Sequence, residues 1–202
     1  WHSLINDPQV RWFLVLTGLV ILLITIDLGR AGNTWLYSIR LASFNTISVI
    51  TGTGYGTANF ALWGGFATTM LLIMMFMGGC AGSTTCGIKM FRLQVLVSTI
   101  KVQIARLLRP HGVVLAYYNN KPVPESVMDA VMGFFYLYIL CFVFLSLFLA
   151  FTGLDFTTAF SGAATAISNV GPGLGDIIGP NGNFNPLPDM AKWAMCFGML
   201  LG

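Results

Sequence analysis

Charged residues are scarce in this sequence. Asp, Glu, Lys and Arg make up 8% of the 202 residues, whereas a soluble domain carries about 25%. Residues 41–88 contain none of the four types, and neither do residues 130–154. A helix that crosses a bilayer needs about 20 predominantly apolar residues, and the mean hydropathy of the chain is +0.79. The sequence therefore predicts an integral membrane protein.

The residues that build metal centres and catalytic sites are also sparse. The chain has two histidines and four cysteines, and no two cysteines form a CxxC pair. We interpret the cysteines as small buried hydrophobic residues rather than as metal ligands or disulfide partners. The sequence shows no paired carboxylates and no nucleophile–base set. It predicts a protein that is not an enzyme and that has no organic cofactor.

Basic residues are gathered in one segment. Six of the ten Lys and Arg residues lie between Lys89 and Lys121, and such clustering marks cytoplasmic segments under the positive-inside rule. Nucleic-acid binding is the alternative use of basic residues. Because these residues flank apolar runs, we expect no nucleic-acid partner. The chain begins on polar residues and ends inside an apolar run, so we interpret it as a piece of a longer protein.

Two glycine-rich stretches are the most informative feature of the chain. They read TGTGYG at 51–56 and SNVGPGLG at 168–175. Irregular backbone at membrane depth is tolerated only where it lines water or is buried in protein. Uncharged, glycine-rich backbone can turn carbonyl oxygens toward a cation and replace its hydration shell. The stretches therefore indicate an ion pathway, and the alternative is close helix packing through small residues.

Each stretch follows a span and a short helix. We expect a span at 12–29 and a helix at 35–50 capped by Asn33 and Thr34, which is too short to cross the hydrocarbon. The plan recurs with a span at 126–152 and a helix at 156–167 capped by Asp155.

Residue spacing supports an internal repeat. Phe44 and Phe160 are 116 positions apart, and Gly54 and Gly171 are 117 apart. Such a repeat implies pseudo-symmetry around a common axis. Two copies cannot comfortably enclose a pore, whereas four could.

Another irregular segment interrupts the span that follows residue 66. Residues 78–87 (GGCAGSTTCG) break the helical pattern, which resumes at 88–108 as a basic amphipathic helix. The segment fails as a phosphate loop, because Ile88 precedes the lysine and Met90 stands where Ser or Thr belongs. We interpret it as an unwound stretch that projects under the pore, with a static kink as the alternative.

The connections are predicted as turns. Residues 113–123 read as a small hairpin around Asn119 and Asn120, and residues 176–188 read as exposed turns before a last helix capped by Asp189. Lys192 lies near the start of that helix. It either sits at the headgroup level or lies behind the second glycine stretch, where it would repel cations or hold the backbone.

Three segments resemble a known family: GGCAGSTTCGIK at 78–89, NVGPGLG at 169–175 and AKW at 191–193. Over nearly its whole length the chain resembles the Trk/Ktr/HKT superfamily of potassium transporters, and within it the bacterial TrkH-type potassium-uptake subunits. The resemblance implies an all-α, potassium-channel-like membrane protein made of tandem span–re-entrant pore helix–span repeats, pseudo-fourfold when complete. This chain resembles the third and fourth repeats, at 1–109 and 125–202, joined by a cytoplasmic hairpin at 110–124.

The resemblance also implies roles for individual residues. The ion-binding filter comprises Thr51, Gly52, Thr53, Gly54, Ser168, Asn169, Val170 and Gly171. Potassium is held at Thr51, Thr53, Gly54, Asn169, Val170 and Gly171. The gating loop comprises Gly79, Cys80, Ala81, Gly82, Ser83, Thr84, Thr85, Cys86 and Gly87, and Lys192 is a pore-tuning charge.

The implied function is potassium transport across the bacterial cytoplasmic (inner) membrane. The alternative is a sodium-transporting or Na⁺/H⁺-coupled relative; in the family a filter serine in place of glycine accompanies sodium, so Gly54 and Gly171 favour potassium. A structural subunit built on a pore fold is a further class. The implied partners are membrane lipid, the other two pore repeats, a cytosolic nucleotide-binding ring protein on the basic face, and a second copy in a homodimer.

Overall fold

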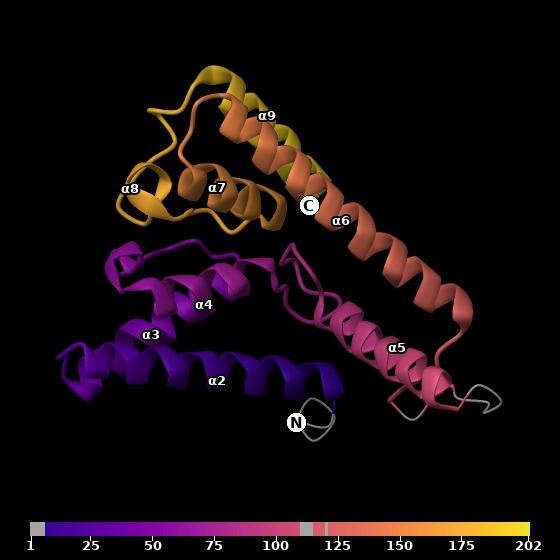
Figure 1. Ribbon diagram of the computed structural model, residues 1–202. Helices are drawn as coiled ribbons and strands as arrows, with labels where there is room; N and C mark the ends of the chain where they lie inside the picture. The colour runs from indigo at the N-terminus through magenta and orange to yellow at the C-terminus, as the bar shows by residue number, and fades with distance from the viewer. Residues whose placement is uncertain (1–6, 110–114, 120) are drawn as a thin grey trace.

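The computed structural model describes residues 7–109, 115–119 and 121–202. These residues are mostly helical, so the all-α prediction is confirmed. In chain order the elements are α2 (Pro8–Arg30), α3 (Trp35–Ile50), the 3-10 helix η1 (Phe60–Leu62), α4 (Gly65–Phe76), α5 (Met90–Leu108), β1 (Tyr117–Tyr118), β2 (Lys121–Pro122), α6 (Glu125–Phe151), α7 (Phe156–Ser168), α8 (Gly175–Ile178) and α9 (Asp189–Leu201), as labelled in Figure 1.

Two of the described helices, α2 and α6, are long and apolar enough to cross a membrane. With 23 and 27 residues, they measure roughly 35 and 40 Å at about 1.5 Å per residue. Both predicted spans are therefore confirmed as helices. α2 begins four residues before the predicted start, because the side chain of Asp7 accepts a hydrogen bond from the backbone N–H of Gln9 at 2.8 Å and caps the helix there.

The two short helices form where the sequence predicts them. Of the expected caps, Asp155 is confirmed, since its Oδ2 accepts from the N–H of Thr158 at 3.1 Å. The prediction for α3 is confirmed in position only, and the prediction for α9 is wrong. Thr34 occupies the N-cap position of α3 without a side-chain cap bond. Asp189 is the first residue of α9, where its carboxylate binds Lys192 instead.

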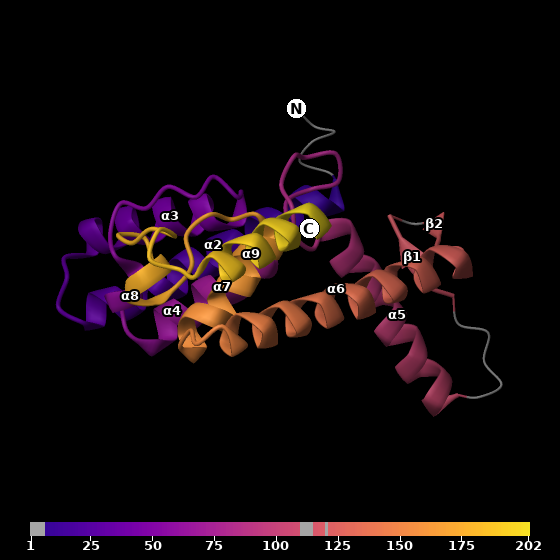
Figure 2. The same cartoon turned by 90° about the horizontal axis from the view of Figure 1, so that it is seen from above.

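The elements form two groups that lie one against the other. In Figure 1, α2, α3 and α4 lie on one side and α6, α7, α8 and α9 on the other, with α4 and α7 facing each other between them. Figure 2 shows that α5 and the beginning of α6 extend beyond both groups, with the hairpin at that end. There Arg106 and Glu125 form an ion pair at 3.7 Å, and Arg92 lies 3.7 Å from the ring centre of Phe134.

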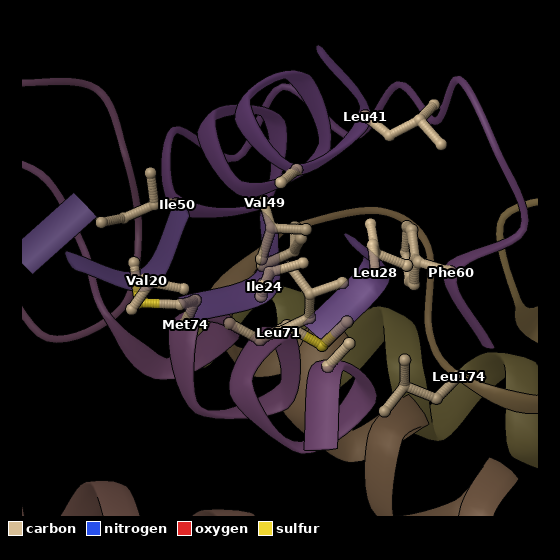
Figure 3. Close-up of a cluster of buried hydrophobic side chains, with 14 of the residues drawn as sticks. Val20, Ile24, Leu28, Leu41, Val49, Ile50, Phe60, Leu71, Met74 and Leu174 are labelled. Carbon is tan, nitrogen blue, oxygen red and sulfur yellow. The ribbon is translucent and has the colours of Figure 1, made fainter. Parts of the chain in front are cut away.

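The core of the first group also takes in residues of the second. Ile24, Leu71 and Met74 are buried among side chains of α2, α3 and α4 (Figure 3). Val170 and Leu174, from the second glycine stretch, belong to the same cluster. Burial of these two side chains, at roughly 25 cal/mol per Å² of apolar surface, fixes the second stretch against the first group.

Helix α7 is buried on nearly all sides, whereas α6 is largely exposed. From Thr158 to Ser168, only Phe160 is not fully buried, while α6 buries Val131, Tyr138 and Leu149 alone. Lipid tails are as apolar as leucine, so a span can leave its apolar face outward. α7 instead buries both its small apolar residues and its hydroxyl-bearing residues inside the protein.

The structure corrects two further predictions. Residues 176–188 are not all exposed turns, because Ile178 and Leu187 are buried in the second core cluster. The four cysteines are free, but three are half-buried and Cys196 is exposed, so the prediction that they are buried is wrong. In the hairpin, Tyr118 pairs with Lys121 and Asn119 has a φ of 48°; its residues 113, 114 and 120 lie outside the described part.

Candidate functional site: two facing glycine stretches

The two glycine stretches meet backbone to backbone. Gly54 has a φ of 78°, and a Cβ added there would lie 2.6 Å from the carbonyl oxygen of Val170. Gly171 has a φ of 112°, and its added Cβ would lie 3.4 Å from the Cα of Gly54. Both positive φ and this closeness exclude larger side chains. Gly54 and Gly171 thus bring the two stretches directly together.

The first stretch is held by the helix that precedes it. The carbonyl oxygen of Ser48, in the last turns of α3, accepts from the N–H groups of Thr53 at 3.0 Å and Gly54 at 3.4 Å. The Ser48 hydroxyl donates to the carbonyl of Tyr55 at 2.6 Å. One buried serine therefore orders three consecutive residues of the stretch.

The second stretch is held in the corresponding way. The carbonyl oxygen of Thr165 accepts from the N–H of Val170 at 3.1 Å, and its Oγ1 accepts from the N–H of Gly171 at 3.0 Å. Thr165 lies 117 positions after Ser48, and Gly171 lies 117 after Gly54. The spacing found between the glycines therefore also relates the groups that orient them.

A second pair of contacts follows almost the same spacing. The side-chain oxygen of Asn45 accepts from the N–H of Thr57 at 3.2 Å, and the hydroxyl of Ser161 accepts from the N–H of Leu174 at 2.9 Å. All four side chains that orient the stretches are buried. Sequence reasoning missed them; the signal that could have found them is a polar residue recurring one turn apart on an otherwise apolar short helix.

These bonds leave carbonyl oxygens free. The N–H groups of residues 51–54 and 169–171 bond back to α3 and α7, and within the described residues no hydrogen bond reaches the carbonyls of the same residues. The C-terminal ends of α3 and α7, where the helix dipole is negative, adjoin these carbonyls. Nor do three potential metal-binding side chains come together in the described chain. The site therefore offers neutral backbone oxygens, which suit a weakly held monovalent cation.

The polar side chains of the predicted filter residues form hydrogen bonds within the protein. Thr51 donates to the carbonyl of Ile47 at 2.6 Å and contacts the Thr53 hydroxyl at 2.7 Å. Ser168 shares a buried hydrogen bond of 2.8 Å with the hydroxyl of Tyr138 on α6. Asn169 adopts a left-handed φ of 51° and donates from its side chain to Met199.

The interruption predicted at 78–87 is confirmed. α4 ends at Phe76 and α5 begins at Met90. The backbone is not free between them: the N–H of Gly78 donates to Ile88 at 2.7 Å, and the N–H of Ile88 donates to Phe76 at 2.9 Å. These bonds close the base of a loop whose tip, residues 81–84, is exposed.

Lys192 lies in the first turn of α9. Its Nζ contacts Asp189 Oδ1 at 3.2 Å, and both side chains are partly or largely exposed. An exposed pair of this kind contributes little to stability, about 0–1 kcal/mol. The prediction that Lys192 tunes the pore is not tested by this contact.

Helices long enough to cross a membrane, beside two short helices that end at facing glycine stretches, are typical of membrane transport proteins. The model of the TrkH family, described as a cation transport protein, matches residues 2–202. The chain therefore belongs to the TrkH family. Members of this family are transporters, so the prediction that the chain is not an enzyme is confirmed.

Relatives and a solved structure agree with this assignment. The chain is 45% identical to the Trk system potassium uptake protein TrkI of Halomonas elongata, over 99% of this chain and 41% of the relative. It is 33% identical to TrkH of Escherichia coli, over 98% of this chain and 41% of the relative. The crystal structure of the potassium transporter TrkH from Vibrio parahaemolyticus matches with a TM-score of 0.90 and 35% identity, over 98% of this chain and 42% of that chain. The chain thus spans about two fifths of these relatives.

Proposed function

We propose that the chain forms part of a potassium pathway, with residues 51–54 and 168–171 as two of its filter segments. The observation that carries the proposal is the backbone contact between Gly54 and Gly171, each oriented by the helix before it. The names of the relatives, Trk system potassium uptake proteins, support potassium as the transported ion.

The geometry suits potassium as a transient occupant. An entering ion gives up water and receives carbonyl oxygens from both stretches, while the negative ends of α3 and α7 favour its charge. A carboxylate would bind the ion more tightly and slow its release. Because the oxygens belong to backbone fixed by Ser48 and Thr165, they need little rearrangement when the ion arrives.

The complete site needs the rest of the protein. We propose that two further pore repeats complete a pseudo-fourfold filter, that the loop 79–87 gates the pathway from below, and that Lys192 tunes it. The same proposal places the protein in the bacterial cytoplasmic membrane as a homodimer. It assigns the basic cytoplasmic face to a nucleotide-binding ring protein.

Substitution of the two glycines tests the filter. In the full-length protein, Gly54→Ser and Gly171→Ser force a side chain into positive φ and into the facing backbone. We expect the ratio of K⁺ to Na⁺ uptake to fall at least about fivefold, given a strain of roughly 1–3 kcal/mol per residue. Potassium-dependent growth of an uptake-deficient strain and direct ion-uptake assays measure this.

A matched control separates backbone strain from filter geometry. Gly64 also has a positive φ, 96°, but its Cβ position is open, and it lies before α4. Gly64→Ser should keep the ion preference of the parent. If Gly54→Ser and Gly171→Ser both leave uptake and the K⁺ over Na⁺ preference unchanged, the filter assignment is wrong. A parent protein that takes up Na⁺ in preference to K⁺ would instead support the sodium alternative.

A further inference from the structure

The loop 79–87 is held together by its own small side chains. The N–H of Gly79 donates to Thr85 Oγ1 at 2.8 Å, and the hydroxyls of Ser83 and Thr85 lie 2.8 Å apart. These bonds shape the loop but do not attach it to a span. Its exposed tip carries no large apolar side chain that could anchor it by burial, so polar contacts from outside decide where it lies.

The first outside contact comes from the residue just beyond the loop. Lys89 Nζ donates to the carbonyl oxygens of Ser83 at 2.6 Å and Thr85 at 2.5 Å, and lies 3.3 Å from the Ser83 hydroxyl. All three ammonium protons can therefore be directed at the loop. Hydrogen bonds from a charged donor are stronger than neutral ones, so Lys89 folds the loop back on the start of α5.

The second contact comes from a distant part of the chain. The side-chain oxygen of Gln9, in the first turn of α2, accepts from the N–H of Ala81 at 2.8 Å, across 72 positions of sequence. Gln94 on α5 donates to the carbonyl of Pro8 at 2.8 Å and so ties α5 to the same turn. Gln9 thus attaches the tip of the loop to a membrane span.

The same glutamine also adjoins the hairpin. The Tyr118 ring packs edge to face on Phe91 of α5, with centroids 5.0 Å apart. Burial raises the pKa of the Tyr118 hydroxyl, and a hydrogen bond with the Gln9 side chain opposes that rise.

We propose that Lys89 and Gln9 are positioning residues that together clamp the loop 79–87 in its observed conformation. Neither residue lies in the glycine stretches. Their effect on transport rests on the proposed function, in which the loop is the gate. The clamp itself is a statement about where the loop lies, and it can be measured without transport.

A native cysteine in the loop reports on the clamp. Cys80 is free and half-buried. In the full-length protein with Cys80 as the sole cysteine, purified in nanodiscs, we would measure its rate of modification by a small maleimide. Loss of one hydrogen bond shifts a local opening equilibrium by about two- to tenfold. Lys89→Met and Gln9→Leu should each raise the rate by that factor.

Matched variants control for side-chain type. Lys101→Met and Gln103→Leu make the same changes at exposed positions of α5 and should leave the rate unchanged. Gln9→Glu keeps an acceptor oxygen for the Ala81 N–H, so its rate of Cys80 modification should stay near that of the parent. If Gln9 acts only through packing, Gln9→Glu should not restore the parent rate.

The outcomes separate the clamp from the proposed function. Unchanged rates in both Lys89→Met and Gln9→Leu would overturn the clamp, and if Lys89→Met does not accumulate, Gln9→Leu decides alone. Raised modification rates uphold the clamp whatever the outcome of the filter test. If Gly54→Ser and Gly171→Ser leave the ion preference intact, that result counts against the filter and not against the clamp. If the clamp and the proposed function both hold, Lys89→Met and Gln9→Leu should also raise basal potassium uptake.

Discussion

At the scale of single residues, a few buried polar groups decide how the backbone of each glycine stretch is directed. Ser48 and Thr165 take up the N–H groups, and in the described residues no hydrogen bond reaches the carbonyl oxygens of residues 51–54 or 169–171. An N–H that is buried without a partner costs about 1–3 kcal/mol. Most of these N–H groups bind backbone carbonyl oxygens, whereas the N–H of Gly171 depends on the side-chain hydroxyl of Thr165.

Asp155 offers a test in the pH dependence of stability. Its hydrogen bonds with Thr158 hold the pKa of its carboxyl below the usual value, so its carboxylate stabilises the folded state above the unfolded pKa of about 3.9. That contribution disappears as pH falls through the lower, folded pKa. Asp155→Ala should cost about 1 kcal/mol at pH 7, and the difference from the parent should vanish as the carboxyl of the parent becomes protonated.

The measurement is thermal unfolding of the detergent-solubilised full-length protein between pH 7 and pH values below the unfolded pKa. Asp176→Ala removes an exposed aspartate from α8 and should leave the melting temperature unchanged across the range. A melting-temperature difference between parent and Asp155→Ala that stays constant with pH would show that the cap does not act through its charge.

At the scale of elements, the central feature is that α7 is enclosed while α6 faces outward. The two meet through aromatic side chains: the Phe142 ring lies 4.9 Å from that of Phe160 and 5.1 Å from that of Phe76. Tyr138 belongs to this cluster and also bonds Ser168 at the end of α7. α6 thus contacts both the end of α4, where the loop begins, and the end of α7, where the second glycine stretch begins.

Removal of one hydroxyl tests this contact. Tyr138→Phe keeps the ring in the aromatic cluster but leaves the buried Ser168 hydroxyl without its partner, at a cost of about 1–3 kcal/mol. Because Ser168 begins the proposed filter segment, we expect the K⁺ over Na⁺ uptake ratio of the full-length protein to fall by about tenfold, with protein abundance near that of the parent.

Tyr136→Phe is the matched control, because Tyr136 is 67% exposed on the same helix. It should leave the ratio unchanged. Equal uptake ratios in parent and Tyr138→Phe would mean that the hydroxyl contributes to packing of α6 on α7 but not to the proposed filter.

At the scale of the whole molecule, the placement of charge predicts the orientation in the membrane. The basic residues of α5 and the hairpin lie at the end that extends beyond the two helical groups (Figure 2). Under the positive-inside rule this end is cytoplasmic. The loop that contains Asn185, just before α9, then lies on the outer side of the membrane.

Cysteine labelling checks this orientation. In a full-length protein without other reactive cysteines, Asn119→Cys in the hairpin should react with a membrane-impermeant maleimide only after spheroplasts are lysed. Asn185→Cys, at a position that is also exposed, should react in intact spheroplasts. The opposite labelling pattern would invert the proposed direction of the pathway and place the glycine stretches toward the cytoplasm.

The sequence by itself determined the elements, because their causes are local. Apolar length specifies α2 and α6, short apolar segments specify α3 and α7, and a glycine-rich stretch follows each short helix. The family assignment also followed from contiguous motifs. Caps were less certain, since Asp189 pairs with Lys192 one turn away instead of capping α9.

Only the tertiary structure decided how distant parts meet. It placed Gly54 against Gly171, buried Val170 in the core of the first group, and joined Gln9 to Ala81. Such contacts depend on the relative positions of segments separated by tens of residues, and no periodicity or propensity within a segment records them. The side chains that orient the glycine stretches were missed for the same reason: a serine or threonine in an apolar helix reveals its role only when its hydrogen-bond partner is in place.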